Sequence, residues 1–150
     1  MLYFYTLETE LKNEEIISAI KNYKAIAIRP ELALLEEFIS FSFAKAQEDF
    51  RKKINVANAF QIEWLCRIGC SRNIDKAIAF CKFDCNTVGI ASKTPIPGRI
   101  LKRIGKEAKL GLNRGIEGEI MRRYSITESS LVKYPLEGLL MEKCVVSFLE

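Results

Sequence analysis

Residues 58–82, NAFQIEWLCRIGCSRNIDKAIAFCK, are the most informative segment for the fold, because they predict two helices joined by a short polar turn. In its first half, apolar residues recur at the three- and four-residue spacing of a helix. Residues 69–73 are small or polar and interrupt this periodicity, and Asn73 is a residue type that caps helices. The spacing resumes over residues 74–81. We therefore expect a helical hairpin at the centre of the chain.

A long amphipathic helix is predicted upstream of the hairpin. Apolar residues hold the helical spacing from Glu31 to Phe50, after Pro30, a residue favoured at the first helical position. The basic turn 51–53 ends this helix. Asn58 is then placed to cap the first hairpin helix, with Gln61 completing a capping box.

Within the first hairpin helix, apolar residues cover most sides. Glu63 and Arg67 are spaced to pair at i,i+4 on the remaining polar face. Trp64 has two open interpretations, a core residue or a platform for a stacked base, and its helical spacing favours the core.

Strand and helix patterns alternate irregularly along the rest of the chain. Short apolar runs predict strands at 2–7, 24–29, 87–91 and 110–112. Further helices are expected from Asn13, after Pro97, over 114–124 and from about 129 to 149. These patterns predict one α/β domain over residues 1–150, with a small mixed or antiparallel sheet, a central helical hairpin and a C-terminal helix.

Length and hydropathy set broad limits. A chain of 150 residues with 49% hydrophobic residues can bury a single core. The longest apolar stretches are shorter than the roughly 18 residues of a membrane span, and the N-terminus has no positive region of a signal peptide. We expect a cytoplasmic protein that does not contact a membrane.

Five cysteines occur in a chain without a secretory signal, so we expect reduced core thiols. The spacings Cys66-x3-Cys70 and Cys81-x3-Cys85 leave a cysteine-based metal-binding or redox protein as an alternative.

Catalytic motifs are missing from the sequence. It contains no histidine, which excludes the Ser-His-Asp and Cys-His arrangements, and no glycine-rich phosphate loop occurs. We expect no enzymatic activity, no cofactor and no small-molecule substrate.

Charge is strongly segregated. Residues 51–123 contain 16 basic and 6 acidic residues, a net charge of +10, whereas residues 1–50 carry −4 and residues 124–150 carry −2. If the basic block gathers on one face, it will attract a polyanion such as nucleic acid. A merely solvated surface is the alternative.

Residues 58–67, NAFQIEWLCR, and 71–78, SRNIDKAI, resemble the small, kinase-binding subunit of the KEOPS (EKC) tRNA-modification complex, the family of the PRPK-binding protein TPRKB. The likeness is to archaeal members. In outline it extends over nearly the whole chain, whereas only the hairpin is specific. Residues 81–83, Cys-Lys-Phe, depart from the Phe-Gly turn of the family.

The resemblance implies a non-catalytic subunit. It would bind the small lobe of the kinase/ATPase of the complex through its C-terminal helix and stimulate it. It would also hold the 3′ CCA end of a tRNA that receives threonylcarbamoyladenosine at position 37. The over-apolar terminal helix, the basic middle and the missing catalytic motifs agree with this function. A standalone RNA-binding domain is the alternative.

Two sets of residues are predicted to make these contacts. The tRNA set combines the hairpin turn with two basic segments: Arg67, Ser71, Arg72, Asn73, Arg51, Lys52, Lys53, Arg99, Lys102 and Arg103. Asn73 can also be a plain helix cap. The kinase set is Leu139, Leu140, Cys144, Val145, Phe148 and Leu149, and we expect it to divide between core and interface because one helix cannot bury every face.

Overall fold

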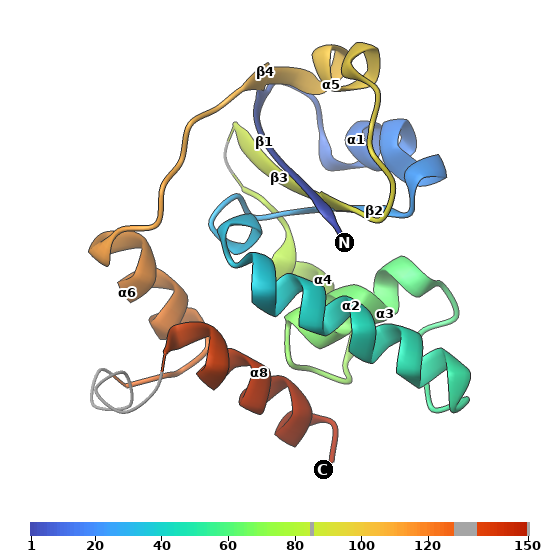
Figure 1. The fold of residues 1–150 in the computed structure, drawn as a ribbon, viewed down its shortest axis with the longest axis vertical. Coiled ribbons are helices and arrows are strands. Elements are labelled where there is room, and N and C mark those ends of the chain that lie inside the picture. Colours follow the sequence, from blue (N-terminus) through green and yellow to red (C-terminus); the bar gives the residue numbers. More distant parts are fainter. Residues whose placement is uncertain (85, 128–134, 150) are drawn as a thin grey trace.

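The computed structural model describes residues 1–84, 86–127 and 135–149 (Figure 1). Its strands are β1 (Tyr3–Thr9), β2 (Ala25–Ile28), β3 (Thr87–Ser92) and β4 (Gly105–Glu107). Its α-helices are α1 (Asn13–Ile20), α2 (Glu36–Arg51), α3 (Phe60–Ile68), α4 (Ile74–Cys81), α5 (Gly98–Ile104), α6 (Arg114–Arg123) and α8 (Leu136–Ser147). Short 3₁₀ segments cover Lys21–Tyr23 and Leu32–Leu34. The predicted α/β class is confirmed.

The four strands form an antiparallel sheet in the order β2-β3-β1-β4. Strand β3 follows the α3–α4 hairpin and inserts between β1 and β2. Gly89 of β3 lies under the 3₁₀ segment, where a Cβ atom would come within 2.7 Å of the Ala33 Cβ. This close approach explains a glycine inside a strand.

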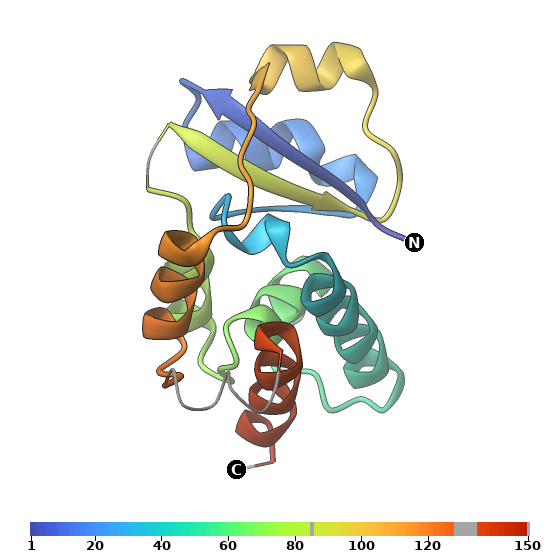
Figure 2. The ribbon, with the colours of Figure 1, turned by 60° about the vertical axis from the view of Figure 1, so that its left-hand side comes forward.

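The sheet separates two hydrophobic cores (Figure 2). Because side chains alternate along a strand, Ile26 and Ile28 of β2 enter one core and Ala25 and Ala27 enter the other. The smaller core lies under α1 and α5, and the larger one is built by α2, α3, α4, α6 and α8.

The helical layer is joined by specific contacts as well as by apolar packing. Helix α2 packs along α3, and Trp64 of α3 is fully buried with its indole N–H donating to the Ile39 carbonyl at 3.2 Å. The Tyr124 hydroxyl, after α6, donates to the Ile68 carbonyl at 2.8 Å. The backbone N–H of Phe38 donates to Glu137 of α8 at 3.4 Å. Trp64 is therefore a core residue.

The predicted hairpin is confirmed as α3 and α4, and the Asn73 side chain caps α4 by accepting from the Lys76 N–H at 3.0 Å. The predicted cap of α3 is wrong. Ala59, not Asn58, is the N-cap residue, and no side chain caps the helix. Buried Glu63 instead accepts from the backbone of the preceding loop.

Other boundaries differ from the sequence prediction. The helix expected from residue 31 begins at Glu36, because Leu35 adopts a non-helical conformation (φ −92°, ψ 65°) after the 3₁₀ segment. Helix α1, in contrast, begins at Asn13 as expected, and its N-cap is Lys12, whose N–H donates to Glu15 at 3.1 Å. Residues 110–112 are irregular, and the fourth strand is β4. Part of the expected terminal helix, residues 129–134, lies outside the described residues.

Candidate functional site

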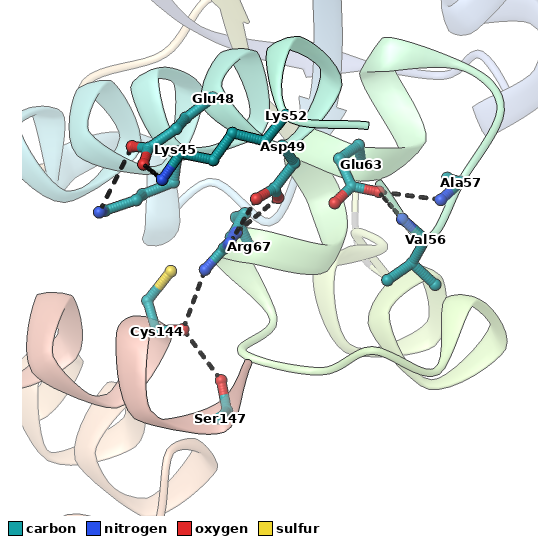
Figure 3. A network of polar contacts seen from close by, with 10 residues as sticks. All are labelled: Lys45, Glu48, Asp49, Lys52, Val56, Ala57, Glu63, Arg67, Cys144 and Ser147. Atoms are coloured by element: carbon teal, nitrogen blue, oxygen red, sulfur yellow. Dashed lines mark hydrogen bonds and ion pairs between the residues drawn. The ribbon is translucent and has the colours of Figure 1, made fainter. Parts of the chain in front are cut away.

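Arg67, predicted to contact tRNA, is an interior residue, and this assignment is corrected. Its side chain forms a two-pronged ion pair with Asp49 of α2, with Nε 2.8 Å from Oδ2 and Nη2 2.5 Å from Oδ1 (Figure 3). Its Nη1 donates to the Cys144 carbonyl of α8 at 3.4 Å, and the guanidinium lies 3.6 Å from the centre of the Phe148 ring. Only 6% of Arg67 is exposed, so it joins α2, α3 and α8 and does not reach RNA.

Glu63 lies beside this ion pair and is fully buried. Its Oε1 accepts from the backbone N–H groups of Val56 and Ala57, at 2.7 and 2.8 Å, whereas Oε2 has no hydrogen-bond donor (Figure 3). Burial raises the pKa of the Glu63 carboxyl, and the neighbouring Asp49 raises it further. A proton on Oε2 would donate toward Asp49. The expected i,i+4 pair of Glu63 and Arg67 on a polar face is therefore also wrong, because Arg67 pairs with Asp49.

The turn of the hairpin presents the other predicted RNA contacts. Ser71 is partly buried, and its hydroxyl accepts from the Asn73 N–H at 3.1 Å. Asn73 is exposed and occupied as a helix cap. Arg72 is exposed between them. Within this turn, Arg72 is the side chain best placed to meet a phosphate.

The basic block does not gather on one face. Arg51, Lys52 and Lys53 end α2, in the helical layer, whereas Arg99, Lys102 and Arg103 project from α5 on the other side of the sheet (Figure 2). All six are exposed. Lys52 also pairs with Glu48 at 2.6 Å, and its hydrogen bond lowers the pKa of the Glu48 carboxyl. The chain therefore presents separate basic clusters.

The predicted kinase-binding residues divide between core and surface. Leu140 and Cys144 are fully buried and are removed from the docking set, and Phe148 is covered on one ring face by Arg67. Leu139 and Val145 are partly exposed, and Leu149 is 79% exposed. Val146, 47% exposed, was not predicted but lies on the surface of the same helix.

The sequence analysis also missed an apolar groove of about 350 Å³ between α1, β2, α3 and α4. Ile17, Ile62, Leu65 and Ile78 supply its apolar walls. Polar groups also line it, namely Lys21 and Lys82, both exposed, and the side-chain amides of Asn13 and Gln61. One feature of the sequence indicates this groove: Ile17 widens the apolar stripe of α1. In the structure Ile17 is exposed.

One wall of the groove is the free edge of the sheet. Strand β2 is an outer strand and pairs with β3 on one side only. Lys93 N–H donates to the Lys24 carbonyl, so the alternation of antiparallel pairing turns the backbone N–H and C=O of Ala25 and Ala27 away from β3. The backbone N–H of Arg29 also points away from β3, and it donates to the Cys81 carbonyl of α4 at 2.8 Å. The groove thus combines apolar walls with backbone groups that can form hydrogen bonds.

The cysteines do not form a metal centre among the described residues, where no group of three or more Cys, Asp or Glu side chains is arranged to hold an ion. Cys66, Cys70, Cys81 and Cys144 are free thiols. Cys85 lies outside the described part of the chain. In the described ranges no helix has the length and apolar character needed to cross a membrane.

No protein-family model matches the chain, and no curated protein matches it. The resemblance to the KEOPS small subunit therefore rests on the residues of the hairpin.

Proposed function

We propose that this protein is a cytoplasmic, non-catalytic subunit of the KEOPS tRNA-modification complex, which binds the unpaired 3′ CCA end of tRNA and docks on the kinase/ATPase subunit through α8. The observation that carries the proposal is the groove beside the hairpin that bears the family resemblance. It joins apolar walls, lysines and hydrogen-bonding groups in one place.

The groove has the chemistry that an unstacked nucleotide needs. Ile17, Ile62 and Ile78 offer apolar contact to the faces of a base. The amides of Asn13 and Gln61 and the outward backbone groups of β2 can pair with base edges. Lys21 and Lys82 can neutralise the phosphates of the same strand. A volume of about 350 Å³ lies in the range of small-ligand sites, so the groove can take an unpaired nucleotide.

The basic residues outside the groove have a second role in this proposal. Arg72, in the turn of the same hairpin, meets the backbone near the end of the strand. Lys102 and Arg103 on α5 attract the body of the tRNA without recognising its sequence, because contacts between exposed basic side chains and phosphates carry no sequence information.

The partly exposed face of α8 carries the proposed kinase contact. Val146 and Leu149 are large apolar residues in water, beside the partly exposed Leu139 and Val145. Covering such a patch with a partner gains free energy because apolar surface leaves water.

A binding experiment with two tRNAs tests the RNA part. Fluorescence anisotropy would compare a tRNA that ends in CCA with the same tRNA trimmed of these three nucleotides. We expect Lys21→Glu/Lys82→Glu to remove the preference for the CCA end, with a loss of about tenfold or more, because each lysine that neutralises a phosphate is replaced by a charge that repels it.

The matched control is Lys102→Glu/Arg103→Glu on α5, which changes the net charge by the same amount at residues that do not line the groove. This variant should weaken the binding of both tRNAs equally and keep the ratio of the two affinities. Equal affinity of the unmodified protein for both tRNAs would reject the groove as the site of the 3′ end. Tight, CCA-dependent tRNA binding by the isolated protein, with no kinase subunit present, would favour a standalone RNA-binding domain.

A further inference from the structure

The outer edge of β2 carries backbone groups that the fold leaves without partners. The C=O and N–H groups of Ala25 and Ala27 point away from β3 and border the groove. In the part of the chain that the structure describes, no hydrogen bond joins them to another residue. Only 5% of Ala25 and 8% of Ala27 are exposed. Polar backbone groups in such a place need a hydrogen-bond partner, and a ligand in the groove can supply it.

The free part of this edge is short, because both of its ends are closed. Just before it, Lys24 adopts a left-handed backbone conformation (φ 52°) that interrupts the strand. At the other end the Arg29 N–H is already bonded to the Cys81 carbonyl. An extended peptide that joins a sheet edge forms main-chain hydrogen bonds along several residues. The edge of a single aromatic base, in contrast, can pair with two neighbouring groups, so the length of the free edge favours a base over a peptide.

The rest of the groove lining suits a flat ring that carries a negative charge. Lys21 and Lys82 border the groove, and no aspartate or glutamate is among the described residues that line it. Neither lysine forms an ion pair with another described residue. Ile17, Ile62 and Ile78 offer apolar contact to the faces of a ring. Two positive charges without acidic partners attract an anion, so the lining matches a nucleotide.

We propose that the groove is a site for an adenine nucleotide, in which the Ala25 carbonyl accepts from the amino group of the base and the Ala27 N–H donates to the ring nitrogen beside it. The phosphate then lies at Lys21 and Lys82. Two sources can supply this ligand, a free nucleotide such as adenosine monophosphate (AMP) and the 3′-terminal adenosine of an RNA. For the RNA source the inference rests on the proposed function, and it adds which groups recognise the base.

The order of acceptor and donor along β2 sets the specificity for the base. Adenine has an amino donor next to a ring-nitrogen acceptor, whereas guanine and hypoxanthine have a carbonyl acceptor next to a ring N–H donor. A base that is anchored through its phosphate presents one order of groups to the strand. Guanine or hypoxanthine would therefore oppose donor to donor and acceptor to acceptor, which leaves polar groups unpaired and weakens binding. Cytosine shares the pattern of adenine, but its smaller ring covers less of the apolar walls.

Two nucleotides of equal charge test the base contact. AMP and inosine monophosphate (IMP) have the same size and phosphate, but IMP has a carbonyl in place of the amino group and a proton on the adjacent ring nitrogen. In titration calorimetry with the full-length protein, we expect AMP to bind about tenfold or more tightly than IMP, because two hydrogen bonds are lost with IMP. In NMR spectra the Ala27 amide proton should shift downfield with AMP, as expected for a new hydrogen bond, and should not do so with IMP.

Variants separate the base contact from the phosphate contact. Ala27→Pro removes the donor without the loss of a hydrogen bond to β3, because the Ala27 N–H points away from that strand, and it should equalise AMP and IMP. Lys21→Glu/Lys82→Glu should lose AMP binding. The control Lys106→Glu/Lys109→Glu makes the same change in net charge at exposed residues that do not line the groove, and it should keep AMP binding. The comparison of AMP with IMP on the unmodified protein remains decisive if a variant fails to fold.

Two tRNAs, one that ends in CCA and one that ends in CC-inosine, distinguish the sources of the ligand. A preference for the terminal adenosine without binding of free AMP would assign the site to RNA alone. A preference for AMP over IMP, with equal affinity for tRNA with and without its CCA end, would keep the nucleotide site and reject the proposed RNA function. No preference for adenine in either pair, whether the ligands bind equally or do not bind, would overturn the inference.

Discussion

The two faces of the α3–α4 hairpin differ in how the fold completes them. The inner face presents Trp64 and Arg67 to α2 and α8, where the indole N–H donates to the Ile39 carbonyl and the guanidinium pairs with Asp49. The groove face presents Ile62, Leu65 and Ile78, and within the described part of the chain a groove of about 350 Å³ remains in front of them. Both faces look apolar in the sequence. The difference shows that the neighbouring elements determine which face of the hairpin is buried and which one borders the groove.

The largest expected contrast is between two aspartate substitutions, one in the core opposite the inner face and one at the rim of the groove. Leu140→Asp places a charge in the core opposite the inner face and should prevent folding, because an unpaired buried charge costs several kcal/mol. Ile17→Asp lies at the rim of the groove, where Ile17 is 47% exposed, and should leave the melting temperature nearly unchanged while weakening CCA binding. Circular dichroism melts and anisotropy measure both effects. A folded Leu140→Asp variant would contradict the assignment of α8 to the core.

The same helix offers a control for docking. Val146→Asp should keep the melting temperature, since Val146 is exposed, and lose co-purification with the kinase subunit and stimulation of its ATPase activity. Unimpaired kinase binding would mean that this face of α8 is not the docking surface.

The next effect in size concerns the ion pair of the inner face. Asp49→Ala leaves the Arg67 guanidinium buried without its partner, and we expect a loss of about 3–5 kcal/mol in the free energy of unfolding. Glu48→Ala, one residue earlier and partly exposed, should cost much less, because ion pairs at the surface contribute little to stability. Urea denaturation of the two variants separates them. Equal losses would show that the pair does not stabilise the inner face.

A smaller, pH-dependent effect is expected at Glu63. Because the folded protein raises the pKa of this carboxyl, it binds the proton more tightly than the unfolded chain does. The stabilisation is therefore complete below the ordinary pKa of 4.5 and is lost as the pH rises through the folded pKa. Glu63→Gln keeps the acceptor for Val56 and Ala57 and supplies a permanent donor toward Asp49.

The Gln variant should accordingly match the unmodified protein at low pH and exceed its stability at high pH. Urea midpoints across the pH range measure the difference. A constant difference at all pH values would mean that the ionisation of Glu63 does not contribute.

The smallest effect concerns the caps at the two ends of the hairpin. Asn73→Ala removes the bond to the Lys76 N–H and should cost about 1 kcal/mol. Asn58→Ala, at the position expected from the sequence to cap α3, should be nearly neutral because Ala59 is the N-cap residue. Similar losses in the free energy of unfolding in both variants would support the capping box that the sequence predicts at Asn58.

Sequence patterns alone predict the α/β class, the hairpin, its Asn73 cap, the three longer strands to within two residues and the outline of the terminal helix. These features depend on the local spacing of apolar residues and on residues with strong backbone preferences. Both can be read directly from the sequence. The burial of Trp64 followed from the same periodicity.

Three features depend instead on long-range contacts: the interior position of Arg67, the division of the basic block and the groove beside β2. Arg67 is interior because Asp49, eighteen residues earlier on another helix, meets it with two hydrogen bonds. The basic segments separate because the sheet passes between them. The groove exists because β2 is an outer strand that α1, α3 and α4 only partly cover. Each of these outcomes depends on contacts between distant segments, and no local pattern in the sequence encodes which segments will meet.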